Sequence, residues 1–183
     1  EYDTLTALGS IMGSGGMIVM DEDTSMVQIA HFYLQFTCDE SCGKCTPCRV
    51  GNRRLYELLE EITDGKGTLD TIKKLKMLAV VIKDTALCGL GQTSPNPVLS
   101  TLNNFEDEYM AHVNESRCPA GVCSKLVRYE INEKCVGCGL CRKRCPVNCI
   151  NGEQREKHSI DQVKCIKCGS CYQVCKFHAI DKR

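Results

Sequence analysis

Eight of the sixteen cysteines form two runs of identical spacing between residues 135 and 175. Each run reads Cys-x2-Cys-x2-Cys-x3-Cys, and the second begins thirty residues after the first. The segments CVGCGLCRKRCPVNCI and CIKCGSCYQVCKFHAI also share one glycine and the closing isoleucine. Closely spaced thiolates on one loop, completed by a donor from elsewhere, are the ligands of an iron–sulfur cluster, so this internal repeat predicts two clusters. The runs comprise Cys135, Cys138, Cys141 and Cys145, then Cys165, Cys168, Cys171 and Cys175.

Zinc and disulfide bonds are the alternatives for so many thiols. Two zinc knuckles would need only paired CxxC donors and would leave the tandem CxxCxxCxxxC runs unexplained. Disulfide frameworks do not need CxxCxxC triplets. Because iron-binding thiols must stay reduced, we expect a cytoplasmic protein. No signal peptide is visible, and no apolar run is long enough to span a membrane.

The two runs resemble those of bacterial two-cluster ferredoxins. In that family the fourth cysteine of each run ligates the other cluster. The resemblance therefore implies one 4Fe-4S cluster on Cys135, Cys138, Cys141 and Cys175. It implies a second cluster on Cys145, Cys165, Cys168 and Cys171. The second run has Lys176 where the first has Pro146, a change in loop stiffness that removes no ligand.

Charge is divided unevenly along the chain although the total is zero. Residues 1–127 hold 11 Lys and Arg against 17 Asp and Glu, whereas residues 128–183 hold 12 against 6. Two clusters, each a dianion with its thiolates, would offset about four of these positive charges. The remaining basic residues favour an acidic protein partner. A nucleic acid is the weaker interpretation, because these residues interleave with the cysteines instead of lining one helix face.

Upstream of the runs, apolar residues recur at helical spacing in four segments. We expect helices from Ser25 to about Phe36, from Pro47 to Asp64, from Leu69 to about Ala86 and over residues 98–109, with Thr46 as the N-cap of the second. Short connections between amphipathic helices favour a four-helix bundle. The glycine-rich run before them, MGSGGMIVM, lacks the spacing of a phosphate-binding loop, and we expect a turn feeding a short strand at residues 17–20.

A further cysteine set lies at the ends of two of these helices. The triplet Cys42-x2-Cys45-x2-Cys48 precedes and opens the second helix, and Cys88 follows the third. In an up-and-down bundle those positions share one end, so the four thiolates can converge on a third 4Fe-4S cluster. A zinc ion on the same four residues is the alternative.

Three soft ligands, His112, Cys118 and Cys123, fall within twelve residues between the helices and the cysteine runs. They could hold a zinc ion that fixes the angle between two domains. Alternatively, His112 continues the apolar face of the fourth helix and the two cysteines are buried thiols. Cys38 and Cys149 match no ligand pattern, and we expect both to be structural.

The segments ESCGKCTPCRVG and LCGLGQTSPNPV resemble the iron–sulfur end of the flavoprotein subunit of respiratory complex I. With the ferredoxin repeat appended and AHVNESRCPAGVC between, the chain resembles a narrower group, the NADH-oxidising flavin subunits of multi-subunit, electron-bifurcating or NAD(P)-linked [FeFe] hydrogenases. That resemblance favours zinc at the histidine and its two cysteines. Relatives often have cysteine where this chain has Ser25, so the fourth zinc ligand is open.

The resemblance also implies the organisation and the activity. The fold class would be α+β: the end of a preceding domain over 1–22, a four-helix iron–sulfur bundle over 23–113, a linker over 114–127 and a ferredoxin-like domain over 128–183. FMN and NAD(P) would bind to an upstream domain. Partners would be an iron–sulfur-rich [FeFe] hydrogenase subunit, a thioredoxin-like [2Fe-2S] subunit and soluble ferredoxin.

No nucleophile with a base and no paired carboxylates are visible, so we expect no catalytic residue and only one-electron transfer in this segment. Two other functions are open. The same tail occurs in NADH-linked formate dehydrogenases, and a zinc-stapled interaction module would carry no electrons at all.

Overall fold

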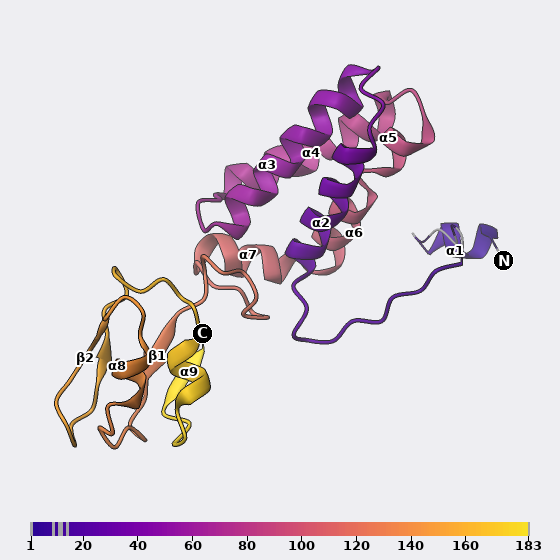
Figure 1. Cartoon of the computed structure of the whole chain (residues 1–183). Helices are drawn as coiled ribbons and strands as arrows, with labels where there is room; N and C mark the ends of the chain where they lie inside the picture. Colours follow the sequence, from indigo (N-terminus) through magenta and orange to yellow (C-terminus); the bar gives the residue numbers. More distant parts are fainter. Residues whose placement is uncertain (1, 9, 11–12, 14, 183) are drawn as a thin grey trace.

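The computed structural model describes residues 2–8, 10, 13 and 15–182. Figure 1 shows a helical domain, a smaller C-terminal domain of short strands and helices, and an N-terminal helix at the end of an extended segment. The long helices come first in the chain, and the short strands that follow are interspersed with two five-residue helices, a mixed helix and strand arrangement. Within the described residues, no helix is long and apolar enough to cross a membrane.

The N-terminal segment does not contain the expected strand. After helix α1 (Tyr2–Ala7) the chain runs extended toward the helical domain (Figure 1). The side chains of residues 17–20 are exposed, and this segment pairs with no other among the described residues. A strand needs a neighbour to satisfy its backbone hydrogen bonds, and the described part of the chain supplies none here. In the expected glycine turn, Gly13 and Gly15 have left-handed φ angles of 55° and 85°, while residue 14 lies outside the described residues.

Helix α2 (Met26–Glu40) begins where the sequence predicts and extends one turn further. Its N-cap Ser25 accepts a hydrogen bond from the backbone N–H of Gln28 at 3.4 Å. The Glu108 carboxylate, from helix α7 (Glu106–Asn114), accepts a second from the Met26 N–H at 2.8 Å. A carboxylate here also meets the positive end of the α2 dipole. These contacts fix the start of α2 to α7.

The second expected helix has an unusual first turn. Segment η1 (Pro47–Gly51) is π-helical and continues into helix α3 (Asn52–Thr63). Thr46 has helical backbone angles and its side chain makes no capping bond, so the expected N-cap is wrong. A π-helical turn is wider than an α-helical one and is often found at functional positions. Here it carries Cys48. Helix α4 (Leu69–Thr85) follows, close to its expected bounds.

The fourth expected helix is two helices, so the helical domain is not a simple four-helix bundle. After the short α5 (Gly89–Thr93), α6 (Asn96–Asn104) ends at Phe105, whose φ and ψ of −135° and 40° are not helical. The acidic residues that follow suit the N-terminus of a new helix, α7. The turn lets the Tyr109 hydroxyl meet the Thr101 hydroxyl at 2.8 Å in the buried interior. The core packs around Val27, Ala30, Leu34, Leu55, Leu59, Ile62, Leu75, Ala79, Ile82 and Val98.

The C-terminal domain consists of two similar halves. Strand β1 (Tyr129–Ile131) pairs antiparallel with β4 (Ile180–Lys182), and β2 (Ile150–Asn151) pairs antiparallel with β3 (Ser159–Ile160). Five-residue helices α8 (Leu140–Arg144) and α9 (Ser170–Val174) carry the third cysteine of each run. The halves share left-handed φ angles at three equivalent pairs: Gly137 and Lys167, Gly139 and Gly169, Asn148 and His178. The sequence repeat is therefore also a repeat of backbone conformation.

The Gly137→Ala variant should destabilise the C-terminal domain more than Gly139→Ala does. Both glycines have left-handed φ angles, 67° and 73°, so an alanine is strained by about 1–2 kcal/mol at either. Only at Gly137 would the added Cβ meet backbone, 2.4 Å from the Glu156 nitrogen, whereas at Gly139 nothing lies within 4 Å. The apparent Tm at one scan rate should be lower for Gly137→Ala by about 5 °C or more. Equal melting of the two variants would contradict this packing.

Candidate functional site

One cavity of the C-terminal domain gathers four cysteine side chains with apolar neighbours. Its volume is about 340 Å³, and no Lys, Arg, Asp or Glu side chain contributes to its wall. Cys175, the last cysteine of the second run, lies here with the first three of the first run. The structure thus brings together the four residues predicted to hold the first cluster. The lining includes Cys135, Cys138, Cys141, Cys175, Ile131, Leu140, Phe177 and Ile180.

A second cavity, of about 300 Å³, gathers the second predicted set. Here Cys145, from the end of the first run, joins the first three cysteines of the second run. The near-equal size of the two cavities follows from the backbone repeat. Four thiols around an apolar space are the donor set and surroundings of a cluster bound by thiolates. The lining includes Cys145, Cys165, Cys168, Cys171, Tyr129, Ile150, Ile160 and Ile166.

Hydrogen bonds are directed at the sulfur atoms of both sets. The backbone N–H of Cys149 points to Cys145 Sγ at 3.3 Å, and the equivalent N–H of Ala179 points to Cys175 Sγ at 3.3 Å. A hydrogen bond with Ser170 lowers the pKa of Cys168. Donors of this kind stabilise negative sulfur, so the loops suit thiolate ligands.

Cys149, which we expected to be structural, lines the cavity of the second predicted cluster. Its thiol is buried, 3.4 Å from Cys145 Sγ, and it lines the second cavity. Its counterpart in the second half of the repeat is Ala179, which has no thiol. Among the cysteines, only Cys149 distinguishes the second cavity from the first.

The third cysteine set lies at the end of the helical domain near α5 (Figure 1). Cys48 is buried in η1, while Cys42 and Cys88 are exposed. A hydrogen bond from the backbone at Leu87 lowers the pKa of Cys45, so this thiol adjoins the loop that carries Cys88. The helix packing thus brings the triplet and the remote cysteine to the same place. All sixteen thiols of the chain are free, so none is withheld in a disulfide.

Two side chains that the sequence did not single out contact Cys48. The Asn52 amide nitrogen lies 3.4 Å from its sulfur, and the Ser41 hydroxyl lies 3.3 Å from it. Asn52 is fully buried at the start of α3, four residues after Cys48. In the sequence, the only sign of the Asn52 contact is that Asn52 lies about one helical turn after Cys48.

The structure brings His112, Cys118 and Cys123 together at the opposite end of the helical domain. Their ligand atoms all lie within 4.8 Å of one another, and all three side chains are buried. His112 Nδ1 lies 2.7 Å from the backbone oxygen of Glu108, so Nδ1 carries the proton and donates it. The unprotonated Nε2 then faces Cys123 Sγ at 3.4 Å. A carbonyl that fixes the histidine tautomer in this way is usual behind a metal-bound imidazole.

Without a metal, the two thiols of this group share one proton. A hydrogen bond from the Cys123 thiol lowers the pKa of Cys118 to about 3. The same contact raises the pKa of Cys123. Ser25 is buried beside them, and its hydroxyl forms a hydrogen bond with Cys123. Cys38 instead lies near Cys48, at the cluster end, and does not join the group.

Two family models match the chain. Residues 28–112 match the NADH-ubiquinone oxidoreductase-F iron–sulfur binding region, and residues 134–179 match a 4Fe-4S dicluster domain. The first match contains the cysteine set near α5, and the second contains both cysteine runs. The segment with His112 and its cysteines falls at the boundary between them.

Several known proteins are similar to this chain. The NADP-reducing hydrogenase subunit HndC of Solidesulfovibrio fructosivorans is 59% identical over 184 residues, which are 100% of this chain and 38% of that one. The F 2 subunit of NADH-quinone oxidoreductase from Rhizobium meliloti (strain 1021) is 40% identical over 65% of this chain and 28% of its own length. A crystal structure of an NAD+-reducing [NiFe]-hydrogenase in the H2-reduced state has a TM-score of 0.50 and 32% identity, covering 52% of this chain and 16% of that one. The chain therefore spans well under half the length of these relatives.

Proposed function

The chain belongs to the family of F subunits of NADH-linked oxidoreductases, matching their C-terminal iron–sulfur part, and from that premise we propose that it holds three 4Fe-4S clusters. Bound there, the clusters supply one-electron transfer. The ligands would be Cys42, Cys45, Cys48 and Cys88; Cys135, Cys138, Cys141 and Cys175; and Cys145, Cys165, Cys168 and Cys171. The residues around them direct hydrogen bonds at the thiolates.

The exchange of fourth cysteines between the two cavities carries this proposal. Cys175 lies with the first run and Cys145 with the second, although each follows the other three cysteines of its own run. Tetrahedral zinc would be satisfied by two CxxC pairs and would not need this exchange. Iron–sulfur clusters in tandem-run ferredoxins use it.

The proposal extends to the whole protein through its relatives. HndC is named as a subunit of an NADP-reducing hydrogenase, and its match covers this whole chain. We therefore favour an electron-bifurcating, NAD(P)-linked hydrogenase over a formate dehydrogenase. FMN and NAD(P) would bind to another part of the full protein. An [FeFe] hydrogenase subunit, a thioredoxin-like [2Fe-2S] subunit and soluble ferredoxin would exchange electrons with it.

Metal analysis of the anaerobically purified protein tests the cluster assignment. This segment should contribute about twelve iron atoms and a matching amount of sulfide. Cys175→Ser should lower iron by about four atoms per chain, because the first cluster loses a ligand. Cys149→Ala removes a neighbouring thiol that is not a ligand and should leave iron unchanged. Equal iron in Cys175→Ser and the parent protein would refute the ligand set.

We also propose that His112, Cys118 and Cys123 hold a structural zinc ion. Zinc has no redox chemistry of its own and would fix α7, the linker and the start of α2 to one another. The buried Ser25 hydroxyl is positioned to complete the site as a weak fourth donor. The tautomer imposed on His112 by the Glu108 carbonyl supports this assignment.

Removing the histidine should release the zinc without touching the clusters. We expect His112→Gln to lower zinc from about one atom per chain to near zero while iron is unchanged. His31→Gln, a histidine of α2 that stacks on Tyr56 at 4.3 Å, is the matched control. Ser25→Cys supplies a fourth thiolate and should slow zinc loss to a chelator. Full zinc content in His112→Gln would show that the metal lies elsewhere or that the triad binds none.

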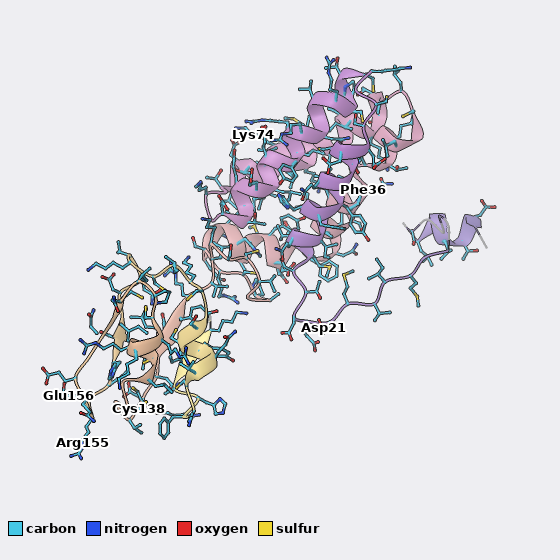
Figure 2. All side chains as sticks on the ribbon, in the orientation of Figure 1. Asp21, Phe36, Lys74, Cys138, Arg155 and Glu156 are labelled. Atoms are coloured by element: carbon cyan, nitrogen blue, oxygen red, sulfur yellow. The ribbon has the colours of Figure 1, made fainter. Side chains whose placement is uncertain are left out.

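A basic hollow beside Cys138 suits an acidic electron-transfer partner. Cys138 is exposed and lines this hollow together with Arg142 and Lys143. Figure 2 shows Cys138 and Arg155 at the end of the C-terminal domain that faces away from the helical domain. Arg142 also donates to the Gly152 carbonyl at 3.0 Å, so it stabilises the hollow as well as charging it. We propose that soluble ferredoxin docks here.

Reversing one charge in this hollow should slow the exchange of electrons with ferredoxin. Lys143→Glu should reduce the second-order rate several-fold at low ionic strength, and the effect should shrink at high salt because the Debye length falls. Lys76→Glu, an exposed charge reversal on α4, is the control. Stopped-flow rates over a salt series measure both variants. A salt-independent loss, or the same loss in Lys76→Glu, would place the docking site elsewhere.

A further inference from the structure

A buried polar connection lies directly behind the third cysteine set. Asn52 is 0% exposed, and its amide nitrogen lies 3.4 Å from Cys48 Sγ. Its Oδ1 lies 2.8 Å from the hydroxyl of Ser94, a residue 42 positions away that is 5% exposed. Polar side chains are costly in an apolar core unless their hydrogen bonds are made. Both the oxygen and the nitrogen of the Asn52 amide have hydrogen-bond partners, and the partner of the nitrogen is a proposed cluster ligand.

The direction of both hydrogen bonds follows from the chemistry of the thiolate. An iron-bound cysteine sulfur has no proton and can only accept, so the NH2 of Asn52 must face Cys48. The carbonyl of the amide then faces the Ser94 hydroxyl, whose single proton is donated to this oxygen and shared with the Gly91 carbonyl. The two bonds point the same way, toward the sulfur, and each polarises the other.

Close packing prevents the amide from turning away. At Gly91 an added Cβ would lie 2.6 Å from Ala86 Cβ and 3.2 Å from Cys48 Cβ, so the backbone of α5 lies directly against the cysteine. Ser94 ends this same helix, and its hydroxyl is also 2.9 Å from the Gly91 carbonyl oxygen. The Asn52 side chain is therefore held between η1 and α5 in one orientation.

We propose that Asn52, oriented by Ser94, raises the reduction potential of the cluster on Cys42, Cys45, Cys48 and Cys88, an inference that rests on the proposed function. One-electron reduction makes the cluster and its thiolates more negative by one charge. A fixed N–H donor stabilises the reduced state more than the oxidised state, and hydrogen bonds to sulfur are a known determinant of cluster potential. Asn52 contacts a thiolate of this set, so the effect belongs to one of the three clusters.

Redox titration of the anaerobically purified full-length protein, followed by EPR, tests the inference. In Asn52→Leu, one titrating component should shift to lower potential while the others stay in place. We expect the ratio of reduced to oxidised cluster at a fixed potential to fall about tenfold, which is about 59 mV for a one-electron couple. Ser94→Ala should shift the same component in the same direction by less, because the amide keeps its donor but loses its orientation.

A matched asparagine on the same domain controls for the substitution itself. Asn104 is exposed in α6, and its amide donates to the Ser100 carbonyl at 2.8 Å. Asn104→Leu should leave every midpoint unchanged. An unmoved midpoint in Asn52→Leu with full iron content overturns the inference. If Asn52→Leu loses iron, Ser94→Ala decides, and an unmoved midpoint there overturns the inference as well. A parent protein that contains fewer than about twelve iron atoms per chain would instead refute the proposed function.

Discussion

The structure depends on bringing thiols from distant parts of the chain together in three separate groups. Neither cysteine run completes a set by itself, because the fourth donor comes from the other run in the C-terminal domain and from beyond α4 in the helical domain. Each proposed cluster would therefore crosslink distant parts of the chain as well as carry electrons. A small core becomes stable when a metal group joins its parts, so the proposed clusters would couple metal binding to folding.

The two halves of the C-terminal domain share backbone conformation but differ in some side chains around their cavities. Backbone angles are kept even where the side chain disfavours them: Lys167 has a φ of 58° where its counterpart is Gly137. A non-glycine residue is strained in this region, so the loop conformation itself, with its amide groups directed at the sulfurs, must be what the fold retains. Side chains facing the cavities are less constrained, and Cys149 opposite Ala179 gives the two cavities different surroundings.

Ligand spacing and helix periodicity could be read from the sequence because both are local. The cysteine runs, the four apolar segments and the grouping of His112 with its cysteines needed only positions along the chain. The break at Phe105 and the π-helical turn at Cys48 could not be read, since each is decided by packing against residues far away, such as Tyr109 on Thr101. Asn52 was missed for the same reason: nothing in its neighbourhood along the chain indicates that Ser94 orients it.

Helix α2 connects two sites with different tasks. Its N-cap Ser25 lies beside Cys123, and the residue after its last turn, Ser41, contacts Cys48, so about 22 Å of helix separates them. Zinc could not relay electrons, and the triad is therefore suited to attachment. The linker agrees with this task, because Leu126 packs with Cys118 and Cys123 and also contacts the turn at Gly65, where an added Cβ would lie 2.6 Å away. A linker packed this tightly holds the C-terminal domain against the helices.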